Sequence, residues 1–226
     1  MALRINFNLA ASAAQRGLAA SQDSYAKQAE HLSSGLRINR ASDDAAGLAV
    51  SEKLKNQVRG LNQAQRNAQD SISLIQTAEG ALTETHSLLA RMRELAVQSS
   101  NDTLTASDRA NLNAEFTQLQ AEVDRIATST QFNAALLLNG SGTATALTFQ
   151  IGANSGDTLA LAIDGTQAST LNVAFNSANG MAGVAYQSSA SAVISILDVA
   201  VNVVSEDRAE LGAVQNRLES TIRSLA

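Results

Sequence analysis

Residues 43–100 have the sequence DDAAGLAVSEKLKNQVRGLNQAQRNAQDSISLIQTAEGALTETHSLLARMRELAVQSS, with no proline and only three glycines. Every seventh residue along this segment is apolar, which places an apolar stripe on one side of a helix. We call these residues the first apolar stripe: Leu54, Leu61, Ala68, Ile75, Leu82, Leu89 and Ala96. Such a helix is about 85 Å long, and its stripe needs other helices to cover it. The sequence therefore predicts a rod along which the other segments pack.

The composition argues against several classes of protein. The chain has 226 residues and no cysteine, so it has no disulfide and no thiolate site. Its net charge of −5 argues against nucleic acid as the main partner. We expect no membrane partner, because no run of roughly 18 apolar residues is present. Residues 9–14 are too short for the apolar core of a cleaved signal peptide.

The segment before residue 43 contains a weaker helical pattern. Residues 1–8 alternate apolar and polar side chains, which predicts a short extended arm. Residues 9–32 form a helical pattern with Leu18, Tyr25 and Leu32 seven residues apart, and this face is marginal without a partner. Residues 33–42 break the pattern. Ser42 is expected to cap the long helix, and Asp43 and Asp44 to supply negative charge at its first turn.

After the long helix, the pattern predicts a second helix that folds back on it. Residues 105–108 form a capping box, with Thr105 at the cap and Asp108 three residues later. The apolar side chains that follow recur at 4-3-4-3 spacing: Leu112, Phe116, Leu119, Val123 and Ile126. Because the connection is short, the two helices are expected to be antiparallel.

The period then changes from helical to alternating. Residues 147–151 and 159–163 alternate apolar and polar side chains around the turn sequence of residues 152–157, which predicts a β-hairpin. Asn and Asp in that turn are interpreted as turn residues, since their spacing does not fit a calcium loop. Residues 166–187 have little period and are expected to form a surface loop.

Sevenfold spacing returns from residue 188 onward. We call this set the second apolar stripe: Ala190, Leu197, Val204, Leu211, Leu218 and Leu225. Val193, Ala200 and Val214 supply a second row beside it. Two long stripes allow two helices to pack side by side without a globular core. The predicted fold class is mainly α, an elongated antiparallel helical bundle or coiled-coil rod with a small β-hairpin.

The chain carries no pattern typical of catalysis. His31 and His86 are its two histidines, and neither lies in a metal-binding spacing. There is no Gly-Lys dipeptide for a phosphate-binding loop and no G-x-S-x-G nucleophile motif. We therefore expect no enzyme activity, no catalytic residue, no cofactor and no metal.

Four segments resemble bacterial flagellin. They are LSSGLRINRASDDAAGLAVSEKLKNQVRGLNQAQRNAQDSISLIQTAEGAL at residues 32–82, RMRELAVQSSNDT at residues 91–103, QFNAALLLNG at residues 131–140 and RAELGAVQNRLESTI at residues 208–222. The third segment has Ala134 where the family usually has glycine. The resemblance covers most of residues 1–165 and 188–226.

The resemblance implies a structural role in the flagellar filament. Flagellins are secreted unfolded through the flagellum's own channel, so the export apparatus, the filament cap and other flagellin subunits become expected partners, and the location is the extracellular flagellum. The implied divisions are residues 1–43 as an arm and inner-tube helix, 44–165 and 188–226 as a rod domain, and 166–187 as a short variable loop. This chain would be a minimal form without outer variable domains.

The resemblance also implies recognition by an animal innate-immune receptor. Arg91, Leu95 and Glu115 match the family positions at that surface, and we expect them to converge on one exposed face of two antiparallel helices. The alternative is that these residues only pack one rod against another.

Flagellins usually continue beyond a terminus such as Ala226, into a helix that pairs with the first helix. On this resemblance we expect residues 1–40 to lack their partner and to be poorly ordered or packed on another copy. The chain alone is then expected to polymerise poorly, and the secretion chaperone to bind weakly or not at all.

Two other functions fit part of the pattern. A hook–filament junction protein belongs to the same superfamily, but its members tend to carry proline near residues 40–47, where this chain has none. A flagellin-like surface protein that binds polysaccharide would need stacking aromatic side chains. The chain has no Trp and only Tyr25 and Tyr186 as tyrosines.

Overall fold

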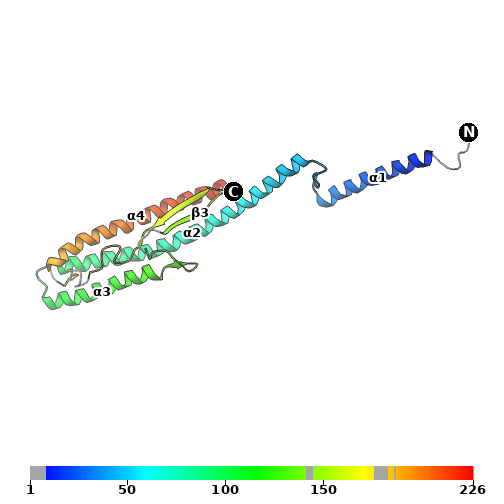
Figure 1. Ribbon diagram of the computed structural model, residues 1–226. Helices are drawn as coiled ribbons and strands as arrows, with labels where there is room; N and C mark the ends of the chain where they lie inside the picture. Colours follow the sequence, from blue (N-terminus) through cyan, green and yellow to red (C-terminus); the bar gives the residue numbers. More distant parts are fainter. Residues whose placement is uncertain (1–8, 141–144, 176–182, 186, 226) are drawn as a thin grey trace, which may run out of the picture. The chain divides into compact units, whose positions relative to one another are not determined.

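The computed structural model describes residues 9–140, 145–175, 183–185 and 187–225 (Figure 1). The expected arm at residues 1–8 lies outside these ranges. The chain divides into two compact units, residues 1–59 and residues 60–226, which we describe separately.

Unit 1 contains helix α1 (Leu9–Ser34) and the first part of helix α2 (Ala45–Ser99). The predicted first helix is confirmed, and so is its weak apolar face, since α1 has no buried residue. Leu18, Tyr25 and Leu32 are all exposed. Residues 9–34 form a continuous helix, and the expectation that residues 1–40 are poorly ordered or packed on another copy stays a prediction.

The start of α2 differs from the sequence prediction. Asp44, not Ser42, accepts the capping hydrogen bond, with its Oδ1 2.8 Å from the backbone nitrogen of Gly47. Asp43 instead closes the connecting turn, because its carboxylate accepts hydrogen bonds from the backbone nitrogens of Asn39 and Arg40. These hydrogen bonds lower the pKa of Asp43, with that from Arg40 the largest cause. Asp44 caps α2 because it directly precedes Ala45, the first residue of the helix. Ser42 lies two residues earlier in the chain.

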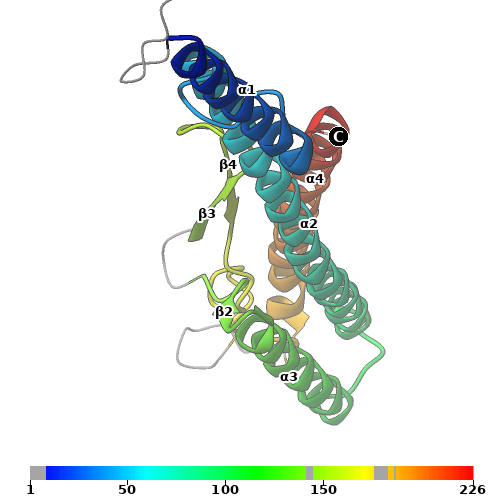
Figure 2. The same ribbon diagram turned by 90° about the vertical axis from the view of Figure 1, so that its right-hand side faces the viewer.

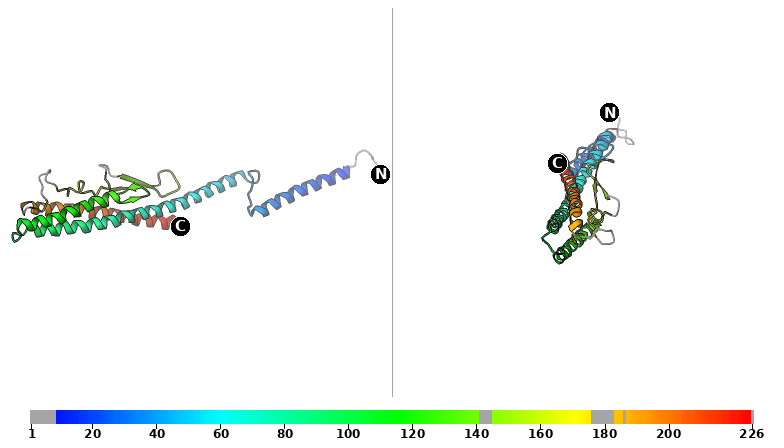
Figure 3. Two further views of the ribbon diagram at one scale, coloured as in Figure 1. Left: turned by 90° about the horizontal axis from the view of Figure 1, so that it is seen from below. Right: turned by 90° about the vertical axis from the view of Figure 1, so that its left-hand side faces the viewer.

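Unit 2 is a bundle formed by residues 60–99 of α2, helix α3 (Ala106–Ser129) and helix α4 (Gln187–Leu225), visible in Figures 2 and 3. The two apolar stripes supply much of its core. The buried members are Ala68, Ile75, Leu82, Leu89 and Ala96 of the first stripe, and Ala190, Leu197, Val204, Leu211 and Leu218 of the second. The predicted fold class, a mainly helical antiparallel bundle with a small hairpin, is confirmed.

The predicted second helix is also confirmed in detail. Thr105 caps α3, and its side chain and that of Asp108 each accept from the other's backbone nitrogen, which is the predicted capping box. Phe116, Val123 and Ala127 are the buried residues of this helix. Phe116 contacts the ring of Phe175, with 5.6 Å between ring centroids.

The predicted β-hairpin comprises β3 (Thr145–Gln150) and β4 (Thr158–Ile163), which pair antiparallel with Leu147 opposite Leu161. Alternate residues of β4 are buried, and Leu159, Leu161 and Ile163 join the core of unit 2. The Asp157 carboxylate accepts hydrogen bonds from the backbone and side-chain nitrogens of Asn154, so it closes the turn as expected.

A second, smaller hairpin, which the sequence pattern did not predict, lies between α3 and β3. It pairs β1 (Gln131–Phe132) with β2 (Ala135–Leu136). Its two-residue turn is left-handed, with φ of 49° at Asn133 and 63° at Ala134. Two successive positive φ values are typical of a type I′ turn, which matches the twist of paired strands.

The described part of residues 166–187 differs from the expected surface loop. Thr166, Ala168, Leu171, Val173 and Phe175 are all buried. The backbone nitrogen of Ala168 also donates a 2.8 Å hydrogen bond to Oδ1 of Asp124 on α3. The segment lacks period because it folds into irregular turns, yet its apolar side chains still close the core. The domain divisions given by the resemblance stay predictions.

Helix α4 is, within the described residues, the one helix that is long and apolar enough to cross a membrane by length and composition. Five of the six residues of its second apolar stripe are buried inside unit 2, and Leu225 is half-buried. A helix that packs in the core of a bundle can have the same length and composition.

Candidate functional site

Two of the three expected receptor-binding residues form an exposed ion pair between neighbouring helices. Arg91 of α2 donates from Nε to Oε1 of Glu115 on α3 over 2.9 Å. Its Nη1 donates to Oε2 of Glu94, also over 2.9 Å. The Arg91 side chain is 48% exposed and that of Glu115 is 44% exposed. The structure therefore brings Arg91 and Glu115 together on one accessible surface.

The electrostatics of this pair favour a permanently charged arginine. Hydrogen bonds to Glu94 and then to Glu115 raise the pKa of Arg91 above its ordinary value. The guanidinium is shared between two carboxylates, so it presents a fixed planar group rather than a free side chain. Because the pair is open to water, its contribution to folding stability is small.

Leu95 does not lie on this surface, and the expectation that all three residues share an exposed face is wrong. Its side chain is 0% exposed and belongs to the core of unit 2. Arg91 and Leu95 are four residues apart, which on a helix places them near each other but not identically oriented. Leu95 packs in the core, so its side chain is not accessible on the surface that carries Arg91 and Glu115.

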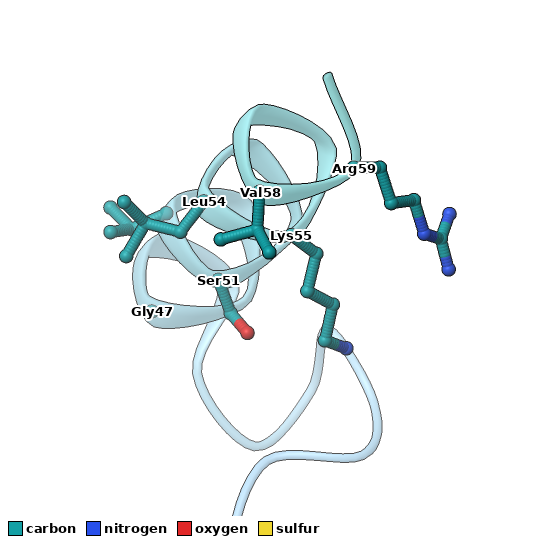
Figure 4. A pocket seen from close by; sticks show the side chains of 7 residues that line it. Gly47, Ser51, Leu54, Lys55, Val58 and Arg59 are labelled. Atoms are coloured by element: carbon teal, nitrogen blue, oxygen red, sulfur yellow. The ribbon is translucent and has the colours of Figure 1, made fainter. Parts of the chain in front are cut away.

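A second candidate surface lies on α2 within unit 1. Val50, Leu54 and Val58 recur every four residues and are exposed, with Leu54 57% exposed. Lys55 and Arg59 flank this row, and Figure 4 shows Leu54 and Arg59 projecting to opposite sides of the view. We call Gly47, Val50, Ser51, Leu54, Lys55, Val58 and Arg59 the basic-apolar face. An exposed apolar row beside cationic side chains is typical of a protein-binding surface.

Neither surface has the features of a catalytic centre. Among the described residues, no group of three or more His, Cys, Asp or Glu side chains is arranged to hold a metal ion. His31 lies near Asp43 in unit 1, with 3.9 Å from Nε2 to Oδ2. His86 has a buried Nδ1 without a hydrogen-bond partner in the described chain. His31 belongs to unit 1 and His86 to unit 2.

Sequence patterns did not identify the polar contacts between distant segments. Nε of Arg93 on α2 donates to Oδ1 of Asp198 on α4 over 2.6 Å. Asn113 of α3 accepts from the backbone nitrogen of Val184 over 3.2 Å. Heptad spacing could have indicated the first contact, because Arg93 flanks the first apolar stripe. No local signal indicates the second.

Stripes that pack helix on helix, together with exposed ion pairs and an exposed apolar row, define a structural, protein-binding helical bundle. Comparisons with known proteins agree. The family model of the bacterial flagellin N-terminal helical region matches residues 5–143. Flagellin of Halalkalibacterium halodurans is 50% identical over 221 residues, which are 98% of this chain and 79% of that protein.

Two further likenesses point the same way. Flagellin of Bacillus subtilis is 44% identical over 250 residues, covering 99% of this chain and 82% of that protein. The crystal structure of Bacillus cereus flagellin superposes with a TM-score of 0.62 at 31% identity, covering 72% of this chain and 89% of that one. The chain belongs to the bacterial flagellin family. These matches confirm the resemblance found in the sequence. Flagellins are structural proteins of the flagellar filament.

Proposed function

We propose that this chain is secreted and assembles with other flagellin subunits into an extracellular filament that serves motility. The exposed basic-apolar face of α2 is the observation that most supports the assembly. Most of the first apolar stripe is buried by the chain itself, whereas Leu54 is open to solvent. Burying one such side chain in a contact between subunits contributes roughly 1.5–3 kcal/mol. The export apparatus and the filament cap are the further partners proposed for this role.

Co-assembly with a similar flagellin tests the proposal. The labelled chain would be mixed with Bacillus subtilis flagellin in a kosmotropic salt, which strengthens apolar burial. The filaments would then be sedimented and imaged by electron microscopy. We expect the label in the pellet and along the filaments. Label that stays in the supernatant while the other flagellin polymerises would contradict assembly.

Matched charge variants locate the contact. Leu54→Asp places a carboxylate in the apolar row, and Asn56→Asp places the same charge on an exposed residue about 200° away around the helix. Leu54→Asp should lower the share of chain in the pellet at least several-fold, and Asn56→Asp should leave it nearly unchanged. Equal loss in both variants would mean that general charge, not this face, controls assembly.

We further propose that Arg91 and Glu115 contact the innate-immune flagellin receptor. Their support is the exposed pair that bridges α2 and α3. Leu95 acts from the core, by holding the helix that carries Arg91. Surface plasmon resonance on the receptor ectodomain should show much weaker binding for Arg91→Ala than for Arg125→Ala, whose guanidinium pairs with Glu122 on its own helix. Equal binding by both variants would exclude Arg91 from the contact.

A hook–filament junction protein and a polysaccharide-binding protein remain the alternative functions. The first predicts that the chain caps filaments without extending them, which the imaging distinguishes. The second predicts retention on a glycan array. Neither outcome is expected, because the relatives named above, which match nearly all of this chain, are flagellins.

A further inference from the structure

One carboxylate stands in an otherwise apolar row of α4. Val193, Ala200 and Val214 recur at sevenfold spacing and are all buried. Asp207 occupies the position between Ala200 and Val214 in the same row. Its Oδ2 is buried and has no hydrogen-bond partner in the described part of the chain. The Asp207 residue as a whole is half-buried, but its buried and unpaired carboxylate oxygen makes the charged form costly.

The end of the β-hairpin adds negative charge beside it. β4 packs against α4, and Ile163, its last residue, is buried. Asp164 follows directly, and its charge acts on Asp207 together with Glu206 and Glu210 of α4. Arg208 is adjacent in sequence, but its buried Nε has no hydrogen-bond partner among the described residues. No described cation forms an ion pair with Asp207 to offset the repulsion.

Helix α2 carries two further titratable groups on the same stretch, the half-buried His86 and the exposed Glu84. Arg93 pairs with Asp198, and α4 runs antiparallel to α2. His86 lies seven residues before Arg93, and Asp207 lies nine residues after Asp198, so both are at similar heights along the pair. The pKa of Asp207, however, is raised first by burial and then by the charges of the three carboxylates named above.

We propose that Asp207 makes the packing of β4 against α4 dependent on pH. The ionised carboxylate repels Asp164 and weakens the contact, and uptake of a proton from mildly acidic solution removes the repulsion and tightens it. The proposal concerns the fold of one chain, and it does not depend on assembly into a filament.

The direction of the effect follows from proton linkage. Burial, and then the charges of Asp164, Glu210 and Glu206, raise the pKa of Asp207 from 3.8 to about 6. The folded chain therefore binds a proton that the unfolded chain does not bind at about pH 5. Stability from this group is fully present below the unfolded value and is lost as the pH rises through about 6. Between about pH 7.5 and 5, the equilibrium constant for unfolding should fall about tenfold from this group alone.

Urea unfolding of the full chain at several pH values tests the proposal. Far-UV circular dichroism is the readout, because the chain has no Trp. The comparison is between the wild type and Asp207→Asn, which has nearly the same shape and cannot ionise. We expect the variant to be more stable at pH 7.5 and to lose the tenfold dependence. The difference between the two curves separates Asp207 from all other titrating groups.

Two controls keep the outcome decisive. Asp164→Asn should reduce the pH dependence, whereas Asp70→Asn, which removes an exposed carboxylate of α2, should leave it unchanged. A carbon-13 NMR titration of the wild type checks the group directly, even if a variant fails to fold. A carboxyl resonance of Asp207 that titrates near 4, or equal pH dependence in the wild type and Asp207→Asn, would overturn the proposal.

Discussion

Arg93 of α2 and Asp198 of α4 are 105 residues apart in sequence, and their Nε and Oδ1 atoms are 2.6 Å apart. The hydrogen bond to Asp198 raises the pKa of Arg93, so the guanidinium stays charged. Near the end of α2, the Gln187 side chain donates to the backbone oxygen of Ser100 over 3.4 Å. These contacts set α4 antiparallel to α2. The two apolar stripes then face each other along the bundle of unit 2.

Deleting a core side chain from either stripe should destabilise unit 2. Leu82→Ala and Leu211→Ala each remove a side chain that is at most 1% exposed. Each should lower the free energy of unfolding by about 2–5 kcal/mol, because lost burial and a cavity add together. Urea unfolding followed by circular dichroism measures the change.

Leu54→Ala is the matched control for that prediction. Leu54 belongs to the same sequence stripe but is exposed in the structure. Its truncation should change the free energy of unfolding by at most about 0.5 kcal/mol. An effect as large as that of Leu82→Ala would mean that Leu54 is buried within the isolated chain.

Replacing Ala134 by glycine should stabilise the chain. Ala134 has a φ of 63° in the small hairpin turn, and left-handed backbone costs a residue with a Cβ about 1–2 kcal/mol. Glycine removes that strain and loses roughly 0.5–1 kcal/mol in backbone entropy. Ala134→Gly should therefore raise the free energy of unfolding by about 0.5–1 kcal/mol in thermal melts.

The neighbouring residue provides the contrast. Ala135 begins β2 and is exposed, so Ala135→Gly adds backbone freedom without relieving any left-handed strain. That variant should be less stable than the wild type. Stabilisation by both changes, or by neither, would show that the turn is not strained at Ala134.

Variants of Leu95 and Arg91 should differ strongly in their effect on folding stability. Leu95→Ala empties a fully buried site and should cost about 2–5 kcal/mol of folding stability. Arg91→Ala removes an exposed ion pair, so the midpoint of urea unfolding should hardly move. Unfolding curves for both variants check this. A large loss of stability in Arg91→Ala would assign the pair with Glu115 a structural role instead.

Periodicity predicted the helices and the larger hairpin well, because each buries one regular face. Leu147 and Phe149, and likewise Leu112 and Phe116, lie where alternation and the 4-3-4-3 spacing place them. The capping box of α3 was also predicted, but the cap of α2 was not. Asp44 rather than Ser42 caps α2, since several adjacent residues had side chains suited to the role.

Irregular packing and side-chain exposure were beyond the sequence patterns. Residues 166–175 have no period, yet Val173 and Phe175 are buried by contacts with distant elements. The family resemblance indicated Arg91 and Glu115 but placed Leu95 on the same exposed face. Whether a helical residue faces water depends on which neighbours flank the helix. That information comes only from the assembled bundle.

Cross-linking of α2 to α4 tests most directly whether the two apolar stripes pack together. The chain has no cysteine, so Arg93→Cys with Asp198→Cys provides one defined pair. A short bis-maleimide should link the pair within one chain in high yield, as read by peptide mass spectrometry. Arg93→Cys with Glu219→Cys is the control, because 21 residues of α4 separate Asp198 from Glu219, or about 30 Å along a helix. A link in the control but not in the first pair would contradict the antiparallel pairing of α2 and α4.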